Sequence, residues 1–328
     1  MRKLAGIRFL IQIALVILML FAHQMMAAGF LQSRGTRVIG NKDVTIPAGG
    51  EESSRPDAPV MIHFLDVGQG SAVLIQTDGE SMLVDAGSSW MGKQVVQYCR
   101  RYGVTSLNIV IASSPSSQKV GGMHHIFQNL PVQLYLDAGS TRLTSPLSSI
   151  ARIAAREDIS HENVHRKKVF QLGSSVAVEV LWPPSEKAFP SDEGEPLLAS
   201  ENVVLAIQIG QIRIFLPSDL PAEAERKLMR SGVKLDSTIM QLADHGARTS
   251  NSSGLLDEVS PEIAIASVGV YNERGVPHSE ILDKLSERNI SLMRTDYHGN
   301  ITIGTDGSRW WIVSERKYES RSPMGNGE

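Results

Sequence analysis

The feature that most constrains the fold is the alternation of short apolar runs with single helical segments through residues 59–316. In the first half, runs of strand type lie at 60–68, 71–77, 81–87 and 107–113, and Asp78-Gly79 forms a hairpin turn. In the second half they lie at 176–184, 203–219, 237–246, 262–269 and 300–314. Single helical segments separate them at 92–102, 147–158, 222–230 and 279–288. Hairpins interleaved with single helices predict one layered α/β or α+β domain over 59–316.

The composition is that of an ordinary globular protein. Of the 328 residues, 42% are hydrophobic and 20% are charged, which is enough to bury a large core. A net charge of −3 gives no general attraction to nucleic acid, and aromatic residues are only 5% of the chain. The basic clusters "VHRKKV" and "CRRYG" are short and lack interleaved aromatic residues for base stacking. Composition alone therefore does not predict a nucleic-acid-binding protein.

Residues 1–28 have the pattern of an export signal. Basic residues precede an apolar run at 9–22, which is shorter than the ~20 residues that a membrane-spanning helix needs. The pattern leaves open whether this segment is a cleaved signal peptide or an anchor in the inner membrane. Residues 29–58 are rich in Gly, Ser, Pro and charge, which predicts a flexible linker, and residues 317–328 are a polar tail. We therefore expect an exported protein with its domain in the periplasm.

Seven segments, in order along the chain, carry a resemblance to a known family. They are "HFLDVGQGSAVLIQTDGESMLVDAG" (63–87), "IASSPSSQKVGG" (111–122), "VEVLWPP" (178–184), "IRIFLPSDLPAEAERKL" (212–228), "DHGARTS" (244–250), "GVPHSEIL" (275–282) and "RTDYHGNITI" (294–303). Together they resemble the metallo-β-lactamase-fold domain of the ComEC competence-protein family. The similarity covers nearly all of the chain after residue 58.

The resemblance implies a four-layer αββα sandwich, with the site where loops meet at one end of the two sheets. In that family the domain is fused to a channel that takes up single-stranded DNA, and it is regarded as a nuclease for the strand left outside. The resemblance therefore implies a link to DNA uptake. Nucleic acid enters as a partner through this family likeness alone, and membrane or envelope proteins are the other partners considered.

In an active member, a loop of the type T-H-P-H-A-D-H-x-G-G supplies ligands to two metal ions, which generate a hydroxide nucleophile. In the matching loop here, Ser113 replaces the threonine, and Ser114 and Ser116 replace the first two histidines. Gln118 replaces the aspartate and Lys119 the last histidine. A hydroxyl is a weaker ligand than an imidazole, and an ammonium group repels a divalent ion. The resemblance thus implies a degenerate metal-binding loop.

Two interpretations of Lys119 remain open. It is an exposed lysine in a loop that has lost its function, since lysines are mostly exposed. Alternatively, its ammonium group takes the place of the lost metal and offers a fixed charge to an anionic ligand, with Ser114, Ser116 and Gln118 as neutral hydrogen-bonding groups.

Some ligand positions in the second half are kept. By the resemblance, Asp219 matches the carboxylate that bridges the metals, His245 matches one histidine of a His-His-Gly motif, and His278 matches the second histidine of a His-Pro-His motif. These residues are the candidates for a single, weakly bound Zn²⁺ or Mn²⁺ ion. The structural alternative is that Asp219 caps the helix at 222–230 and that both histidines bond backbone groups.

Asp66, Asp85 and Asp244 are candidates for lining a cleft. Asp66 and Asp85 end strands before glycine-containing turns, so hydrogen bonds to backbone N–H groups are their expected role. Asp244 stands where the family carries a histidine, and Ser71 stands where the family commonly carries a second acid. Both changes alter the donors available in the site.

Three functions are compatible with the sequence. The favoured one is an exported binding or accessory module that has lost its catalytic metals, and no resident cofactor is expected for it. The second is a residual metal-dependent hydrolase of nuclease or phosphodiesterase type. The third is a structural envelope protein. The changes at Ser114, Ser116, Gln118 and Lys119 favour the first function over the second.

Overall fold

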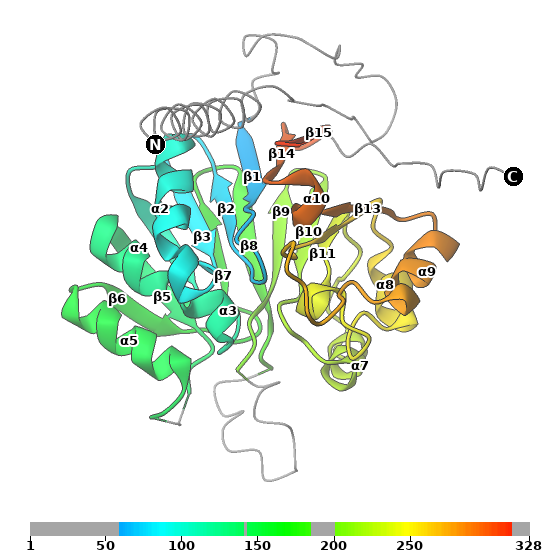
Figure 1. Ribbon diagram of the computed structural model, residues 1–328, viewed down its shortest axis with the longest axis horizontal. Helices are drawn as coiled ribbons and strands as arrows, with labels where there is room; N and C mark the ends of the chain where they lie inside the picture. Colours follow the sequence, from blue (N-terminus) through cyan, green and yellow to red (C-terminus); the bar gives the residue numbers. More distant parts are fainter. Residues whose placement is uncertain (1–58, 141–142, 185–200, 317–328) are drawn as a thin grey trace, which may run out of the picture.

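The computed structural model describes residues 59–140, 143–184 and 201–316. Within these ranges two β-sheets lie face to face, and helices cover the outer face of each sheet (Figure 1). The order of layers is helix, sheet, sheet, helix, which confirms the predicted αββα sandwich. The predicted signal segment, linker and tail lie outside the described residues. None of the helices in the described ranges is long and apolar enough to cross a membrane.

The first sheet has eight strands in the order β15-β14-β1-β2-β3-β4-β5-β6. Neighbours from β15 to β3 are antiparallel, and neighbours from β3 to β6 are parallel. The strands are β1 (Val60–Phe64), β2 (Val73–Gln76), β3 (Ser81–Val84), β4 (Leu107–Ile111), β5 (Val132–Asp137), β6 (Ser160–Asn163), β14 (Ile301–Thr305) and β15 (Trp310–Ser314).

The second sheet has seven strands in the order β13-β12-β11-β10-β9-β8-β7. Here the strands from β13 to β10 are parallel and those from β10 to β7 are antiparallel. The strands are β7 (Val169–Leu172), β8 (Val176–Trp182), β9 (Val204–Ile209), β10 (Ile212–Leu216), β11 (Ile239–Gln241), β12 (Ile263–Ala266) and β13 (Ser291–Arg294). Each sheet therefore joins a hairpin half to a parallel half.

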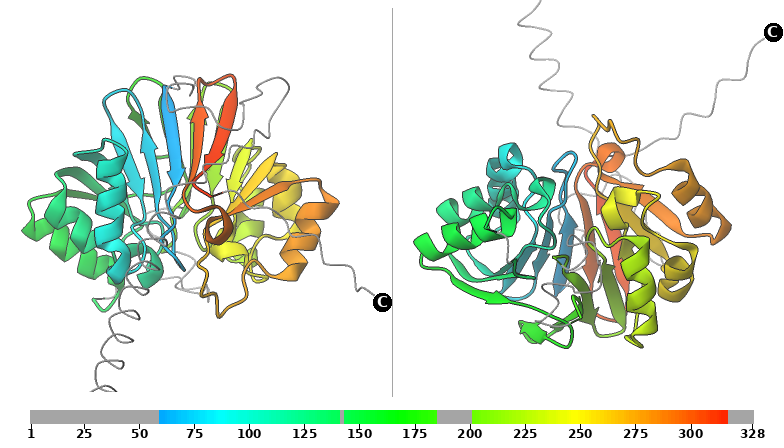
Figure 2. Two further views of the ribbon diagram at one scale, coloured as in Figure 1. Left: turned by 45° about the horizontal axis from the view of Figure 1, so that its top comes forward. Right: turned by 90° about the horizontal axis from the view of Figure 1, so that it is seen from below.

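The longer helices form the two outer layers (Figure 2). The first sheet is covered by α2 (Gly92–Arg101), α4 (Met123–Asn129) and α5 (Pro146–Arg156). The second sheet is covered by α7 (Ala222–Arg230), α8 (Ser253–Val259) and α9 (Ser279–Glu287). Single-turn segments lie in the loops: η2 (Ser89–Met91), α3 (Ser117–Val120), η3 (Ala243–Gly246) and α10 (Thr295–His298).

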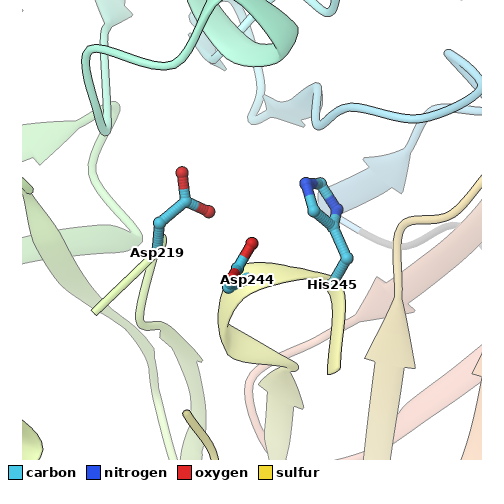
Figure 3. A group of neighbouring side chains, drawn as sticks. All are labelled: Asp219, Asp244 and His245. Atoms are coloured by element: carbon cyan, nitrogen blue, oxygen red, sulfur yellow. The ribbon is translucent and has the colours of Figure 1, made fainter. Parts of the chain in front are cut away.

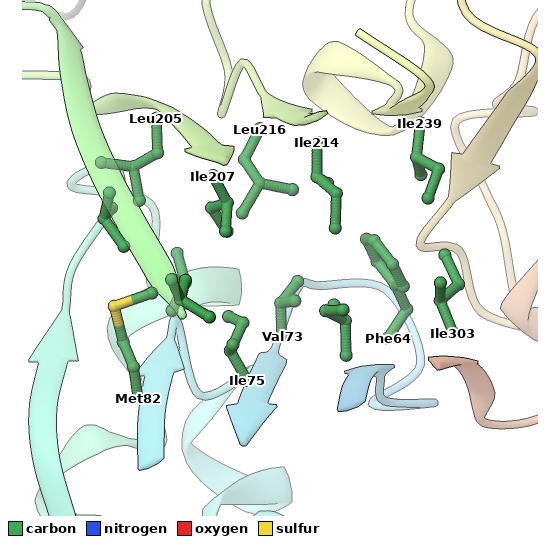
Figure 4. Close-up of a cluster of buried hydrophobic side chains, with 14 of the residues drawn as sticks. Phe64, Val73, Ile75, Met82, Leu205, Ile207, Ile214, Leu216, Ile239 and Ile303 are labelled. Carbon is green, nitrogen blue, oxygen red and sulfur yellow. The ribbon is translucent and has the colours of Figure 1, made fainter. Parts of the chain in front are cut away.

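The buried apolar side chains form three layers, one between the two sheets and one under the helices on each side. In β2, Val73 and Ile75 point into the core between the sheets, whereas Leu74 packs under the helices. Successive residues of a strand face opposite sides of its sheet, so a strand buried on both faces is apolar throughout. Figure 4 shows the central layer, in which Phe64, Val73 and their neighbours from the first sheet meet strands of the second.

Most of the expected strands and helices are present at the predicted places. The structure adds elements that the sequence pattern does not single out: β5, β13 and α8. Residues 158–172 look extended in the sequence, and β6 and β7 lie there. The residues of β6, Ser-His-Glu-Asn, are all exposed at the edge of the first sheet, so no apolar alternation marks the bounds of this strand.

Candidate functional site

The candidate site lies where the carboxyl ends of strands from both sheets meet. Asp85 follows β3, Ser113 follows β4, and Asp219 follows β10. Open α/β sheets bind ligands beyond the carboxyl ends of their strands. The two sheets are bonded to each other here, because Ser114 Oγ donates to Asp219 Oδ2 at 2.8 Å.

Lys119 lies inside this site and is 2% exposed. Its Nζ atom is 2.9 Å from Asp219 Oδ1 and 3.8 Å from Asp85 Oδ2. Nζ also donates to the hydroxyl oxygens of Ser113 and Ser218, each at 3.3 Å. The interpretation of Lys119 as an exposed lysine is wrong, because the two carboxylates and two hydroxyls compensate for the burial of its charge.

The ion pair is fixed in its charged form. Burial lowers the pKa of Lys119, but the charges of Asp219 and Asp85 outweigh this effect and the net pKa is raised. Burial raises the pKa of Asp219, but the Lys119 ammonium, followed by His245, reverses this and the net pKa is lowered. The ammonium is therefore the counter-charge of two carboxylates of the chain itself. The carboxylates neutralise it, so it offers no net positive charge to an external anion.

Asp85 holds the start of the degenerate loop. Its Oδ1 accepts a hydrogen bond from Ser113 N at 2.8 Å, and its Oδ2 accepts one from Ser113 Oγ at 2.6 Å. The expected bond from carboxylate to backbone is therefore present. Burial raises the pKa of Asp85 to about 6, although Lys119 and Ser113 oppose the rise.

Ser218 and Asn202 complete the surroundings of the ion pair, and neither was singled out from the sequence. The Ser218 hydroxyl donates to the Ser113 carbonyl oxygen at 2.7 Å, and its backbone is left-handed with φ 59°. Asn202 Oδ1 lies 3.1 Å from Ser218 Oγ and accepts from Asp219 N at 3.3 Å. The only sequence signal near Ser218 was its position next to Asp219, after the apolar segment that forms β10.

Three candidate metal donors in the described part of the chain lie together. Asp219, Asp244 and His245 each present an atom within 4.8 Å of the others (Figure 3). Asp244 also forms a two-pronged pair with Arg274, in which both N···O distances are 2.8 Å. The sequence marked Asp244 only as a cleft-lining residue, although a carboxylate in place of a ligand histidine is itself a metal donor.

The histidine of this group is already oriented by the backbone. His245 Nδ1 lies 2.6 Å from the carbonyl oxygen of Ser267, so Nδ1 carries the hydrogen. Burial lowers the pKa of His245, against the opposing charge of Asp219, and Lys119 lowers it further. The imidazole is therefore neutral near pH 7. The predicted bond between His245 and a backbone group is confirmed.

The degenerate loop uses its own side chains to hold its conformation. Ser116 Oγ accepts from Gln118 N at 3.3 Å and caps the first turn of α3, while Ser114 Oγ also accepts from Ser116 N at 3.2 Å. The donors present do not fit a two-metal centre. A single ion bound by Asp219, Asp244 and His245 would lie beside the cations that already pair with the two carboxylates, Lys119 and Arg274.

His278 and Asp66 lie outside this donor group. His278 Nδ1 accepts from Arg248 N at 3.1 Å, as the structural alternative expected. Asp66 accepts from Gly68 N at 3.4 Å and pairs with Arg316, which follows β15. Neither residue contributes an atom to the Asp219, Asp244 and His245 group.

Asp219 does not cap a helix. The N-cap of α7 is Pro221, and no side chain bonds the first turn. The carboxylate is instead taken by Lys119 and by the hydroxyl of Ser114. The helix-cap interpretation of Asp219 is therefore wrong.

Ser71 forms a neutral bridge between the sheets in place of the family's acid. Its hydroxyl oxygen accepts from Gln241 Nε2 at 3.1 Å, and the same amide donates to Ser267 Oγ at 2.9 Å. An amide shared between two hydroxyls needs no metal or charge to satisfy it.

A buried carboxylate positions the loop behind the donor group. Glu225 of α7 is 0% exposed and accepts from Asn251 N at 2.6 Å and from Ser252 N at 3.0 Å. Asn251 in turn bonds both backbone groups of Ala243, at 2.8 and 2.9 Å. This chain of bonds fixes the segment that begins η3, and with it Asp244.

No family model matches the sequence. Curated relatives are Recombination protein 2 of Haemophilus influenzae, 27% identical over 260 residues, and Competence protein ComA of Neisseria gonorrhoeae, 27% identical over 251 residues. ComE operon protein 3 of Bacillus subtilis is 23% identical over 260 residues. The matches cover 78%, 76% and 73% of this chain but only 30%, 33% and 32% of the relatives. The chain thus spans about a third of their length.

Solved structures share the fold at low identity. CmlA, a diiron β-hydroxylase from Streptomyces venezuelae, matches 76% of this chain and 55% of its own with a TM-score of 0.52 and 12% identity. YhfI from Bacillus subtilis, a metallo-β-lactamase fold protein, matches 71% and 95% with a TM-score of 0.45 and 12% identity. The order of layers is that of the metallo-β-lactamase fold, and the chain is similar to curated proteins named for competence and recombination.

Proposed function

We propose that the protein is an exported, ComEC-like binding or accessory module that acts in DNA uptake without metal-dependent hydrolysis. The observation that carries this proposal is the ion pair between Lys119 and Asp219. By the resemblance, Asp219 is the carboxylate that bridges two metals in active members. In this chain, an internal ammonium already neutralises it.

The electrostatics oppose a metal at this position. A divalent ion that bound Asp219 would lie a few ångströms from the Lys119 ammonium, in a place where water screens the repulsion poorly. It would also compete with the Lys119 ammonium, which lies 2.9 Å from Asp219 Oδ1. Without two metals, the chain lacks the group that would lower the pKa of a water nucleophile. Hydrolysis of the kind attributed to the family is therefore not expected.

The link to DNA uptake is supported by the relatives, which are named for competence and recombination. The export part of the proposal rests on the pattern of residues 1–28. Fusing alkaline phosphatase after residue 328 tests it, since that reporter is active only outside the cytoplasm.

The decisive experiment measures metal and hydrolysis on the full chain. The purified protein is equilibrated with Zn²⁺ or Mn²⁺, and the metal content per chain is determined. Hydrolysis of single-stranded DNA and of a phosphodiester is assayed on the same samples. An Asp244→Asn, His245→Gln double variant is the matched control, because it removes two donors and leaves Lys119 and Asp219 intact. We expect wild type and variant to be equal in both measurements. Near-stoichiometric metal and hydrolysis that the variant loses would overturn the proposal.

One observation favours a second candidate function, a one-metal hydrolase. Asp219, Asp244 and His245 present donor atoms within 4.8 Å of one another. An ion held by two carboxylates and one imidazole would keep open positions for substrate. This candidate predicts the opposite outcome of the same experiment.

The uptake role has its own test. A strain that lacks the protein is compared with the parent for uptake of labelled DNA and for transformation frequency, and the intact chain is then supplied from a second locus. We expect a loss that the intact chain restores. Unchanged uptake in the deletion strain would remove DNA uptake from the proposal and leave the binding module alone.

A further inference from the structure

The two carboxylates of the donor group each have a cation of their own. Lys119 lies 2.9 Å from Asp219, and Arg274 lies 2.8 Å from Asp244 through both of its terminal nitrogens. We infer that Lys119 and Arg274 together perform the electrostatic task of bound metal ions, and that they keep a latent divalent-cation site at Asp219, Asp244 and His245 closed. This inference rests on the proposed function, since it explains how the site does without metal.

The first argument is connectivity. Lys119 follows β4 of the first sheet, whereas Asp219 follows β10 of the second. Asp244 follows β11, and Arg274 lies in the segment between β12 and α9. The two ion pairs therefore tie together four separate loops at one end of the sandwich. A metal centre joins loops in the same way, by neutralising carboxylates that would otherwise repel one another.

The second argument is the balance of charge. Lys119 and Arg274 contribute two positive charges, and Asp85, Asp219 and Asp244 contribute three negative charges when ionised. The side chain of Asp219 is only 21% exposed and that of Asp244 only 23%, so solvent screens them poorly. Removing both cations would leave the carboxylates of Asp219 and Asp244 facing one another beside the His245 imidazole. Such a group attracts a divalent ion.

The third argument is that the donors are already held in place. Asp85, Ser218, Asp244 and His245 all have left-handed backbones, with φ between 43° and 62°. This conformation is costly for residues other than glycine, so the surrounding loops must hold it. Glu225 and Asn251 anchor the Asp244 segment from behind. The donors would not need to be reassembled when the two cations are taken away.

The experiment uses the full chain with Lys119→Met, with Arg274→Met and with both changes. Arg288→Met is the matched control, because Arg288 pairs with the exposed Asp257 at 2.7 Å, in a surface ion pair between α8 and α9. Zinc per chain is measured by equilibrium dialysis and elemental analysis, and Tm is measured with and without Zn²⁺. These readouts do not depend on any catalytic activity.

We expect the double variant to bind zinc with a Kd at least ~100-fold below that of the wild type, since two nearby positive charges no longer oppose the ion. Zn²⁺ should raise the Tm of the double variant but not that of the wild type or of Arg288→Met. Adding Asp219→Asn to the double variant should abolish both the increase in zinc affinity and the increase in Tm, because the ion would lose a donor.

The outcomes separate this inference from the proposed function. Tight zinc binding by the wild type would overturn both. A wild type without metal, together with a folded double variant that also gains none, would overturn this inference alone. If the double variant folds only when Zn²⁺ is present during refolding, the inference is supported. If the double variant does not refold even with zinc, the single Arg274→Met variant decides. The inference is then wrong if this single variant binds no more zinc than the wild type.

Discussion

Lys119 Nζ lies 2.9 Å from Asp219 Oδ1, and this contact joins the two sheets at their carboxyl ends. Lys119 belongs to α3, between β4 and α4, whereas Asp219 follows β10. The ammonium is 2% exposed, so the pair is an internal part of the fold and not a surface contact. It follows that the degenerate loop still has a structural task, which is to supply a positive charge between two carboxylates.

Replacing Lys119 should destabilise the protein strongly. Lys119→Met leaves the buried Asp85 and Asp219 without their shared counter-charge, so we expect the free energy of unfolding to fall by ~3–5 kcal/mol. Urea denaturation in the presence of a chelator measures this change. Adding Asp219→Asn should restore a part of the loss, because one of the uncompensated charges disappears. Strictly additive effects of the two substitutions would contradict the pairing.

The free energy of unfolding should depend on pH because Asp85 titrates differently in the folded and unfolded states. Burial raises the pKa of this carboxyl from the ordinary 3.8 to about 6 in the folded protein, with Lys119 and Ser113 opposing the rise. The folded state then holds the proton more tightly than the unfolded state does. The resulting stabilisation is complete below about pH 4 and is lost as the pH rises through about 6. The loss is on the order of 3 kcal/mol.

Asp85→Asn tests this assignment, because it cannot titrate and its amide oxygen can still accept from Ser113 N. Unfolding free energies of wild type and variant are compared between pH 4 and 7. We expect the wild type to lose stability relative to the variant as the pH rises. A difference that stays constant over this range would show that Asp85 titrates normally.

Glu225 should be required for the loop that carries Asp244. Glu225→Ala leaves the N–H groups of Asn251 and Ser252 without their acceptor, and buried unsatisfied donors cost about 1–3 kcal/mol each. We therefore expect the free energy of unfolding to fall by ~2–4 kcal/mol in urea titrations. Glu223→Ala is the matched control, because Glu223 is exposed on the same helix and should change little. Equal effects of the two substitutions would rule out a positioning role for Glu225.

Gly70 should tolerate no side chain. A Cβ atom at this position would lie 2.3 Å from the carbonyl oxygen of Gln118, which is backbone and cannot move aside without shifting the degenerate loop. We expect Gly70→Ala to lower the free energy of unfolding by ~2 kcal/mol or more. Gly254→Ala in α8 is the control, since its Cβ would make ordinary contacts of 3.5 and 3.7 Å with the Met229 side chain. Thermal denaturation should show the control at or slightly above the wild-type Tm.

The sequence pattern by itself predicted a layered α/β domain, and the resemblance to a known family implied the αββα sandwich and a loop without the usual metal ligands. Strand alternation such as Val73, Leu74 and Ile75 predicts two buried faces, because side-chain direction in a strand is a local property of the backbone. The serines at 114 and 116 are likewise visible in the sequence, and a hydroxyl is a weaker zinc ligand than an imidazole. The bounds of edge strand β6 could not be predicted, because its exposed polar residues carry no periodic apolar signal.

Only the tertiary structure decided the surroundings of Lys119 and of the remaining carboxylates. Lys119 was expected to be exposed or to face an external anion, and it is instead buried against Asp219, a hundred residues further along the chain. Arg274 and Asp244 are paired across a separation of 30 residues, which no spacing rule in the sequence indicates. Whether a charge is buried, and which group compensates it, depends on the loops that the folded sheets bring together. For that reason residue types alone could show that histidines are absent from 111–122, but not that the buried Lys119 and the exposed Arg274 each pair with a carboxylate of this group.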